Sequence, residues 1–276
     1  MSLHDDYARL TPFEIAFPDR TAVAALSAEV AEEAKQRGVD DGVPETFITL
    51  LAVGELVRRM RGPDAPPEST YPFGALLYHG VHFLRGGCPL YLLETGATRR
   101  LVLAVPDAAR GDVRERDTLD PPSVAGYLQL PQHLLWTGGA ATGGTPESLD
   151  GVFWTLSRSG MLHALPISGV LPDRPGFGAM PLPPAPIADA HAWLGAQARA
   201  SGDDFASNLP GGDLDELYSV ETAGEVLKLL ARFFAVADGG EARFDARPGD
   251  SAPDVGRPAG GPRPSKLPYT RVSLAD

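Results

Sequence analysis

Apolar residues recur at helical spacing at both ends of the chain, and this pattern predicts helices there. Residues 19–38 carry such a stripe, which Asp19 can cap and Gly38 can end. A second helix is predicted from Pro44 to Arg61, because proline suits a first helical turn and an apolar stripe follows it. Both helices are expected to be amphipathic and to bury one face.

The C-terminal part combines predicted helices with a tail of low apolar content. Stripes of apolar residues predict helices at 187–198 and 219–237. The second has a broad apolar surface that includes Phe233 and Phe234, which indicates either burial against a sheet or a dimer interface. Residues 245–270 are rich in proline and glycine, so we expect little regular structure there.

The middle of the chain predicts strands, because aromatic and aliphatic residues of one parity share a face in 73–84 and further short apolar runs follow. The expected strands are 73–84, 90–94, 100–105, 124–130, 134–137, 151–156, 161–165 and 167–171. The link 157–160 favours a hairpin, with Gly160 available for a positive φ. Short connections, such as the loop expected at 95–99, predict an antiparallel meander.

Strands in the middle and helices at the ends predict an α+β protein with a central, mostly antiparallel β-sheet packed by N-terminal and C-terminal helices. We expect one globular domain overall. Its parts are an N-terminal helical segment (1–68), an antiparallel β region (69–171), a proline-rich strap (172–186), C-terminal helices (187–240) and a Pro/Gly-rich tail (241–276). Six prolines prevent the strap from pairing as an interior strand, so it should cross the surface or mark a domain boundary.

The charge balance is acidic, with 24 Lys+Arg against 36 Asp+Glu and a net charge of −12. A nucleic-acid binder needs clustered basic residues, and the short group of Arg58, Arg59 and Arg61 is better explained as the end of a helix. No apolar run approaches the ~20 residues of a membrane-spanning helix, and residues 1–6 lack the basic and apolar regions of a signal peptide. We therefore expect a cytoplasmic protein that binds neither nucleic acid nor membrane.

The choice of basic residues and the number of cysteines indicate the type of genome and exclude two kinds of cysteine site. Three of the 24 basic residues are lysines, which leaves 21 arginines. Together with abundant glycine, proline and alanine, this usage indicates a GC-rich bacterial genome. Cys88 is the only cysteine, so neither an intrachain disulfide framework nor a cysteine-rich zinc site is possible.

His79, His82 and Cys88 are the candidate site residues. Two imidazoles and a thiol are suitable zinc ligands, but residues three apart on a strand point to opposite faces. Only a bulge at Gly80 would bring the two rings together, so we predict no metal site and no cofactor. Cys88 lies in a predicted turn, with no helix after it to lower the pKa of the thiol, although His82 could approach it across the turn.

Other features give weaker indications. The glycine-rich run 138–145 lacks the lysine and the helix that accompany a phosphate-binding loop, which favours a plain loop. Glu94 and Asp150 stand at strand ends from which they could enter a cleft. His191 is predicted on the apolar side of its helix, and Trp154 is interpreted as core packing or as a half-exposed interface residue.

These observations favour a non-catalytic interaction or regulatory protein that binds a protein partner or self-associates, with a homodimer through the 219–237 helix as the specific form considered. The alternative is a small-molecule enzyme, hydrolase-like, with a site around His79, His82 and Cys88. A third hypothesis is a carrier that holds an apolar ligand between sheet and helices. A deep pocket where two of the three side chains meet a carboxylate would favour the enzyme.

Overall fold

The fold is described from a computed structural model of the chain. The residues that it describes are 7–38, 48–63, 67–103, 120–132, 136–137, 147–157, 160–168, 178–179, 185–186, 229–249 and 262–275. The predicted helix at 187–198, the run 138–145 and His191 lie outside these residues, as do residues 219–228 of the predicted last helix.

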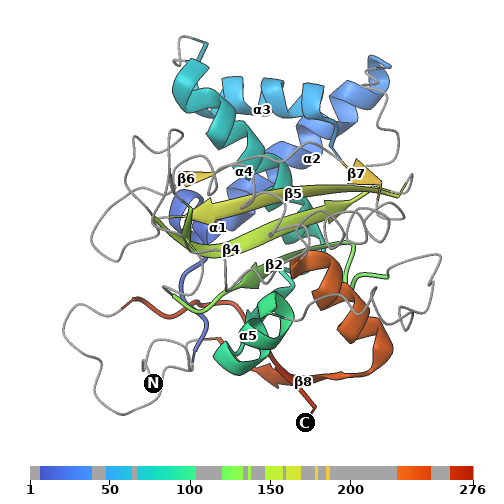
Figure 1. Ribbon diagram of the computed structural model, residues 1–276. Helices are drawn as coiled ribbons and strands as arrows, with labels where there is room; N and C mark the ends of the chain where they lie inside the picture. Colours follow the sequence, from blue (N-terminus) through green and yellow to red (C-terminus); the bar gives the residue numbers. More distant parts are fainter. Residues whose placement is uncertain are drawn as a thin grey trace, which may run out of the picture.

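A mixed β-sheet forms the centre of the protein (Figure 1). Its strands are β1 (Leu90–Leu93), β2 (Ala125–Gln129), β3 (Trp136–Thr137), β4 (Glu147–Leu156), β5 (Met161–Ser168), β6 (Gly178–Ala179), β7 (Ala185–Pro186), β8 (Ala242–Arg247) and β9 (Tyr269–Leu274). They follow the order β6-β5-β4-β2-β1-β9-β8, while β3 pairs with β4 and β7 pairs with β5. β1 runs parallel to β2 and β9, and the other described pairings are antiparallel. The predicted α+β class with a mostly antiparallel sheet is confirmed.

Helices cover both faces of the sheet, in two groups (Figure 1). On one face lie α1 (Pro12–Ala16), α2 (Arg20–Gln36), α3 (Leu50–Arg61) and α4 (Pro67–Arg85). α4 packs against the strands, and α2 and α3 pack on α4. On the other face lie α5 (Thr95–Leu103) and a helix whose described residues are 229–239. Successive strand residues serve the two cores in turn, so that Phe153 belongs to the first and Trp154 to the second.

The prediction of a strand at 73–84 is wrong, because these residues belong to α4. Every residue from 76 to 83 is buried, since the helix lies between the sheet and the pair α2 and α3. A helix that is buried all round carries apolar side chains on every face and loses the one-sided spacing that identifies a surface helix. Gly80 permits the close packing, because a Cβ there would lie 2.3 Å from a ring carbon of Phe13 in α1.

The strand predicted at 100–105 and the loop predicted at 95–99 are also wrong, because residues 95–103 form α5. This helix starts directly after β1, and the amide of Thr98 donates to the carbonyl of Glu94 (2.8 Å). A connection through a helix allows β2 to return beside β1 in the parallel direction, which a short loop cannot do. Among the described strands in the middle of the chain, β2, β4 and β5 follow the predicted antiparallel pattern, whereas β1 does not.

The two N-terminal helix predictions have different outcomes. α2 confirms the helix predicted at 19–38, with a hydrogen bond accepted by Asp19 at its start and Gly38 at φ 65° after its end. The helix predicted from Pro44 starts later, because α3 begins after Thr49, whose hydroxyl accepts a hydrogen bond from the backbone amide three residues on. A threonine hydroxyl satisfies a first-turn amide, which proline does not do, so the cap decides where the helix begins.

The hairpin predicted at 157–160 is confirmed between β4 and β5, with Gly160 at φ 79°. The strands predicted after it at 161–165 and 167–171 are one strand, β5, which runs through Pro166. On the outer side of β5, the short strands β6 and β7 pair only near its two ends. Pro166 falls in the gap between them, at a sheet margin where proline is tolerated.

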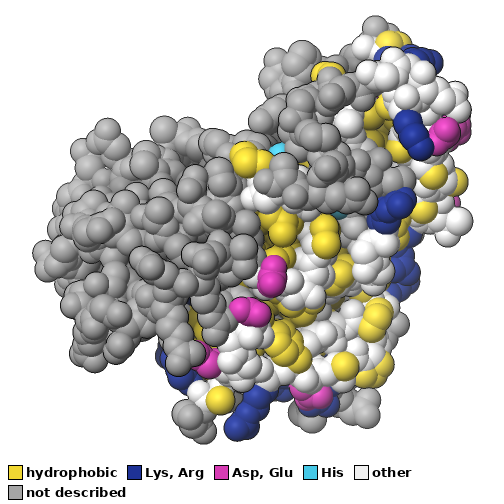
Figure 2. Space-filling model, turned by 90° about the vertical axis from the view of Figure 1, so that its right-hand side faces the viewer, with side chains coloured by type: hydrophobic (Ala, Val, Ile, Leu, Met, Phe, Trp, Pro, Cys, Tyr) yellow, Lys and Arg dark blue, Asp and Glu magenta, His cyan; other side chains and the backbone are white. Residues whose placement is uncertain are grey.

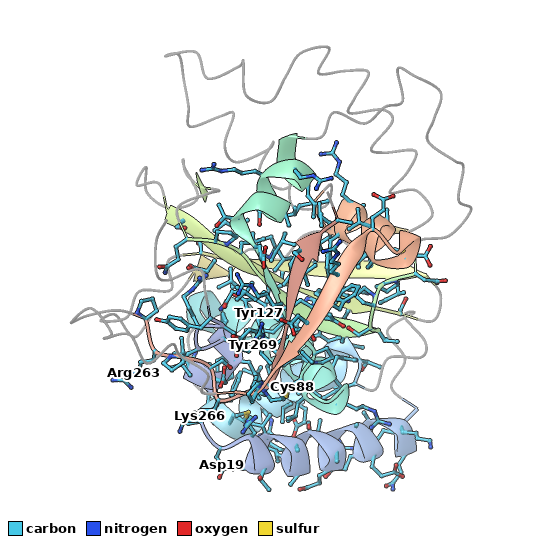
Figure 3. The ribbon with its side chains drawn as sticks, turned by 90° about the horizontal axis from the view of Figure 1, so that it is seen from below. Asp19, Cys88, Tyr127, Arg263, Lys266 and Tyr269 are labelled. Atoms are coloured by element: carbon cyan, nitrogen blue, oxygen red, sulfur yellow. The ribbon has the colours of Figure 1, made fainter. Side chains whose placement is uncertain are left out.

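The C-terminal tail contributes β8 and β9, so the expectation of little regular structure at 245–270 is wrong at both ends of that range. β9 lies inside the sheet, between β1 and β8. Before β9 the chain is held by the N-terminal segment, since the amide of Ser265 donates to the carbonyl of Ala8 (2.8 Å) and the amide of Leu10 donates to the carbonyl of Arg263 (2.9 Å). Figure 3 follows this segment into β9.

The described part of the last helix is buried against the sheet. Phe233 and Phe234 have no exposed surface, and their rings lie 6.1 and 5.5 Å from the ring of Trp154, measured between centroids. The sequence left open whether this helix is buried against a sheet or forms a dimer interface, and residues 229–239 are buried against the sheet. A homodimer through these phenylalanines would require the helix to leave the sheet, and self-association itself stays a prediction.

Candidate functional sites

α4 places His79 and His82 on the same side of one helix. Residues three apart are neighbours on a helix surface, whereas on a strand they point apart. The prediction that the two rings face in opposite directions is therefore wrong, and no bulge at Gly80 is involved. Both residues are buried, with 4% and 8% of their surface exposed.

The sheet adds a third imidazole and a hydroxyl to this pair. Thr155 of β4 and His163 of β5 are direct cross-strand partners beneath α4. Nδ1 of His79 lies 3.1 Å from Oγ1 of Thr155. The ring of Tyr78 packs against His79, His82 and His163, at centroid distances of 5.3, 4.7 and 5.5 Å. We call these five residues the histidine cluster.

The hydrogen bond of His82 fixes the tautomer of its ring. Nδ1 lies 2.8 Å from the carbonyl oxygen of Tyr78, and because a carbonyl can only accept, Nδ1 carries the proton. Nε2 is buried without a hydrogen-bond partner among the described residues. Protonation would make Nε2 a buried donor, and burial lowers the pKa of His82 to about 4, against the opposing effect of the Tyr78 carbonyl.

The same cause acts on His79. Burial lowers its pKa well below the ordinary value, and His82 and His163 add to this because imidazolium charges repel one another. His79 and His82 are therefore neutral at neutral pH. A neutral imidazole in contact with the Thr155 hydroxyl is the kind of pair in which a base activates a nucleophile. Within the described ranges, no group of three His, Cys, Asp or Glu side chains is arranged to hold a metal ion.

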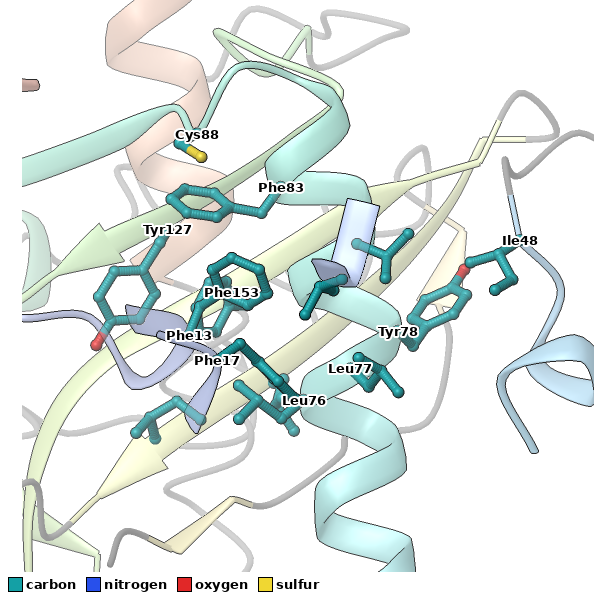
Figure 4. Packing of buried hydrophobic residues seen from close by; sticks show 14 of the residues in the cluster. Phe13, Phe17, Ile48, Leu76, Leu77, Tyr78, Phe83, Cys88, Tyr127 and Phe153 are labelled. Atoms are coloured by element: carbon teal, nitrogen blue, oxygen red, sulfur yellow. The ribbon is translucent and has the colours of Figure 1, made fainter. Parts of the chain in front are cut away.

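Cys88 lies apart from the histidine cluster. It follows α4 with a left-handed backbone (φ 59°), and its amide donates to the carbonyl of Phe83 (2.8 Å). Figure 4 shows Cys88 beside Phe83, while Tyr78 lies on the other side of the same core. Burial raises the pKa of the thiol more than the neighbouring Arg20 lowers it. The structure does not bring Cys88 to His82, and a raised pKa is the opposite of what a nucleophilic thiol needs.

Thr155, His163 and Tyr78 were not among the residues singled out from the sequence. A signal existed for His163, because it has the same parity as Leu165 in a strand expected to be buried on one face. The same signal existed for Thr155, which has the parity of Phe153 in its predicted strand. Tyr78 had no such signal, since only a helical α4 places it above β4 and β5.

Two carboxylates that were expected at a cleft are engaged within the fold. Asp150 is buried at 3% exposed, and its charge adds to the burial that raises the pKa of Tyr127, while Arg9 acts in the opposite direction. Glu94 forms an ion pair with Arg271 of β9 (2.6 Å). Neither carboxylate approaches the histidine cluster as the enzyme hypothesis required.

Arg58 and Arg59 at the end of α3 are paired with carboxylates of the protein, and the guanidinium of Arg61 lies over the ring of Phe73. Arg59 forms ion pairs of 2.7 to 2.9 Å with Glu55 of α3 and with Glu29 and Glu33 of α2. Hydrogen bonds from Arg58 and Arg59 lower the pKa of Glu55 to about 2. Basic and acidic side chains accordingly lie together in the upper right of the face shown in Figure 2. This group joins α3 to α2 and does not form a basic patch.

The two edges of the sheet differ in how they are covered. The edge at β5 is lined by β6 and β7 from the proline-rich strap, and Pro186 lies opposite Met161. The described pieces of the strap pair with the outer side of β5, at an edge of the sheet where proline is tolerated. The opposite edge is β8, whose outer side pairs with no described strand. Five of its six residues are exposed.

The backbone of β8 directs the hydrogen-bonding groups of every second residue outward. The carbonyl of Glu241 accepts from the amide of Ala275 (2.9 Å), so the odd-numbered residues bond to β9. The amides and carbonyls of Ala242, Phe244 and Ala246 therefore point away from β9. The side chain of Phe244 on this strand is 43% exposed. The hairpin of β8 and β9 lies in the foreground of Figure 3. We call the outer side of residues 242–247 the β8 edge.

Comparisons with known proteins do not assign the chain to a family. No family model matches the sequence. No curated protein matches it either. Among the helices in the described part of the chain, none combines the length and the apolar character needed to cross a membrane.

Proposed function

We propose that this protein is a non-catalytic interaction protein of the bacterial cytoplasm, and that it binds its protein partner at the β8 edge. The observation that supports this proposal is the exposed edge strand. Natural sheets usually cover or blunt their edges, because unpaired amides and carbonyls are a template for another strand. This sheet lines one edge with a proline-rich strap and leaves the other open among the described residues.

Strand addition at this edge would use both backbone and side chains. The outward amides and carbonyls of Ala242, Phe244 and Ala246 supply hydrogen bonds, which give affinity without regard to sequence. Side chains that alternate between the two faces supply specificity. Exposed Phe244 is the apolar contact on one face, and the charged Arg243 and Asp245 are the contacts on the other.

Site-specific photocrosslinking in the native host tests this proposal. A photoreactive phenylalanine analogue at Phe244 is expected to form covalent adducts with a protein partner. The same analogue at Leu51 of α3 is the matched control, because Leu51 is more exposed (60%) but lies on a helix in the layer beyond α4. Adducts at position 244 that are absent at position 51 support the proposal. Equal adducts at both positions, or none at 244, would contradict it.

A hydrolase-like enzyme is the second candidate, and the contact between His79 and Thr155 is the observation that favours it. In such a reaction the Thr155 hydroxyl would attack the acyl carbon of an ester and pass its proton to His79, and the alcohol would leave with that proton as its bond to the acyl carbon breaks. Water would then hydrolyse the acyl group from Thr155 and restore the hydroxyl. Thr155→Val keeps the shape and removes the hydroxyl, so it is expected to abolish hydrolysis of a panel of nitrophenyl esters. Cys88→Ala should leave that hydrolysis unchanged. A wild-type protein with no esterase activity, or a fully active Thr155→Val variant, rejects this candidate.

A further inference from the structure

We infer that the partner at the β8 edge is a second copy of this chain, whose β8 pairs antiparallel with the first about a two-fold axis at Phe244. This inference rests on the proposed function and names the partner. It would join two sheets into one continuous sheet through an isologous contact, the usual form of a symmetric dimer.

The direction of the backbone groups agrees with this register. Ala242, Phe244 and Ala246 present their amides and carbonyls outward, because the odd-numbered residues are bonded to β9. With the axis at Phe244, that residue faces its own copy and Ala242 faces Ala246 of the second copy. Each of these is a pair of outward residues, so each can exchange two hydrogen bonds.

The charges of β8 are self-complementary in the same register. Arg243 faces Asp245 of the second copy, and Glu241 faces Arg247 of the second copy. The two-fold axis repeats both contacts, so four oppositely charged pairs form along one face. Within one chain Asp245 is paired with Arg247, and the dimer would add Arg243 of the other copy to this pair. Opposite charges directly across an antiparallel pair are stabilising.

The neighbouring registers are unfavourable for the same reason. Sliding one strand by two residues in one direction places Arg243 opposite Arg243 and Glu241 opposite Asp245. Sliding it by two in the other direction places Asp245 opposite Asp245 and Arg243 opposite Arg247. Both shifts bring like charges together, which is destabilising and selects the register centred on Phe244.

The apolar face supplies the remaining contact. Phe244 lies on the side of the sheet that holds Tyr91, at a ring-centroid distance of 6.3 Å, and 43% of it is exposed in the single chain. In the dimer the two Phe244 rings would be neighbours across the axis, so each would cover exposed surface of the other. Aromatic cross-strand pairs of this kind stabilise antiparallel strands.

Sedimentation equilibrium of the full chain tests the assembly. At about 100 μM, well above the micromolar Kd of a weak contact, we expect twice the monomer mass of 29.2 kDa. The solution should contain roughly 0.15 M salt, which screens the repulsion between two acidic proteins beyond about 8 Å. A monomer under these conditions would overturn the inference. It would leave the photocrosslinking result at Phe244 intact, so the two proposals can fail separately.

Disulfide trapping tests the register. F244C should form a crosslinked dimer under mild oxidation, because facing residues of a hydrogen-bonded pair have Cα atoms about 5.5 Å apart, within disulfide range. R243C is the matched control, since its copy would lie on a diagonal at about 7–8 Å or more, too far for a disulfide. The wild-type chain controls for Cys88. A dimer in which R243C crosslinks as well as F244C would contradict the register.

A proline variant separates the edge contact from the fold. A246P removes an outward amide that takes no part in the pairing with β9, so the variant should fold normally and sediment as a monomer. A246V keeps the amide and should remain dimeric. R243E places like charges opposite Asp245 and should raise the dimer Kd at least tenfold, and R243E/D245R should restore it. A dimer unaffected by A246P would show that another surface holds the copies together.

Discussion

Gly151→Ala should lower the free energy of unfolding by about 3 kcal/mol, out of the roughly 5–15 kcal/mol typical of a natural domain. A Cβ at Gly151 would lie 2.5 Å from Cζ and from the hydroxyl oxygen of Tyr127 and 2.6 Å from the carbonyl oxygen of Leu128. Tyr127 is buried, and the Leu128 oxygen belongs to the backbone of a central strand, so neither can move away at low cost. Urea denaturation followed by circular dichroism measures the change.

Two further alanine variants serve as comparisons for Gly151→Ala. Gly126→Ala also creates a contact of 2.4 Å, but the nearest atoms all belong to the ring of Trp154, so the added variant Trp154→Phe should recover part of the loss. Gly54→Ala meets no atom within 4 Å on α3 and should stabilise by about 1 kcal/mol, since alanine is the better helix former. A Gly151→Ala protein as stable as the wild type would contradict the packing described for β2 and β4.

Acidification from pH 6.5 to 4 should destabilise the protein by about 3 kcal/mol through His82 alone. The pKa of His82 is near 4 in the folded protein and 6.5 in an exposed chain, so between these values the unfolded state binds more protons. Stability is therefore full above pH 6.5 and falls as the pH drops towards 4. His79 acts in the same direction, because burial lowers its pKa as well. Urea midpoints at a series of pH values measure the slope.

Removal of the two imidazoles should flatten this profile. His82→Asn retains an amide donor for the carbonyl of Tyr78, and the side-chain amide of His79→Asn can form a hydrogen bond with the Thr155 hydroxyl, so both variants keep a polar contact without the titration. The pKa of Glu55 is near 2, so its contribution to the free energy of unfolding is lost only as the pH falls below about 4.5. Glu55 therefore does not affect the slope between pH 5 and 6.5. An unchanged slope in that region for the double variant would exclude His79 and His82 as its cause.

The sequence was sufficient for the class of fold and for elements with local signals. Asp19 is a residue type that caps helices, and Gly160 is a residue type that adopts a positive φ in turns. The predicted helix start and the predicted hairpin turn are both confirmed. The sequence pattern did not predict α4, because burial on all sides removes the amphipathic spacing of a helix. It did not predict β9 either, because a short tail segment gives no indication of its partners, β1 and β8. Burial in a particular tertiary surrounding leaves little trace in local pattern.

The histidine cluster could not be predicted for the same reason. Its residues come from three elements, and the error in α4 reversed the relation between His79 and His82. Once α4 is a helix, the argument that separated these two rings no longer applies, and the pair with Thr155 becomes the observation in favour of catalysis. The case for binding at the β8 edge does not depend on that argument, because it stands on the backbone of a different part of the sheet.

The position of β9 has a consequence for synthesis of the protein. β9 is translated after every other described strand, yet it fills the gap between β1 and β8. While the ribosome still holds residues 269–274, β1 lacks one neighbour and β8 lacks its only described neighbour. The sheet therefore closes after these residues emerge, and contacts between such distant segments make that closure slow. A nascent chain stalled before residue 269 should be far more open to proteases than the released protein.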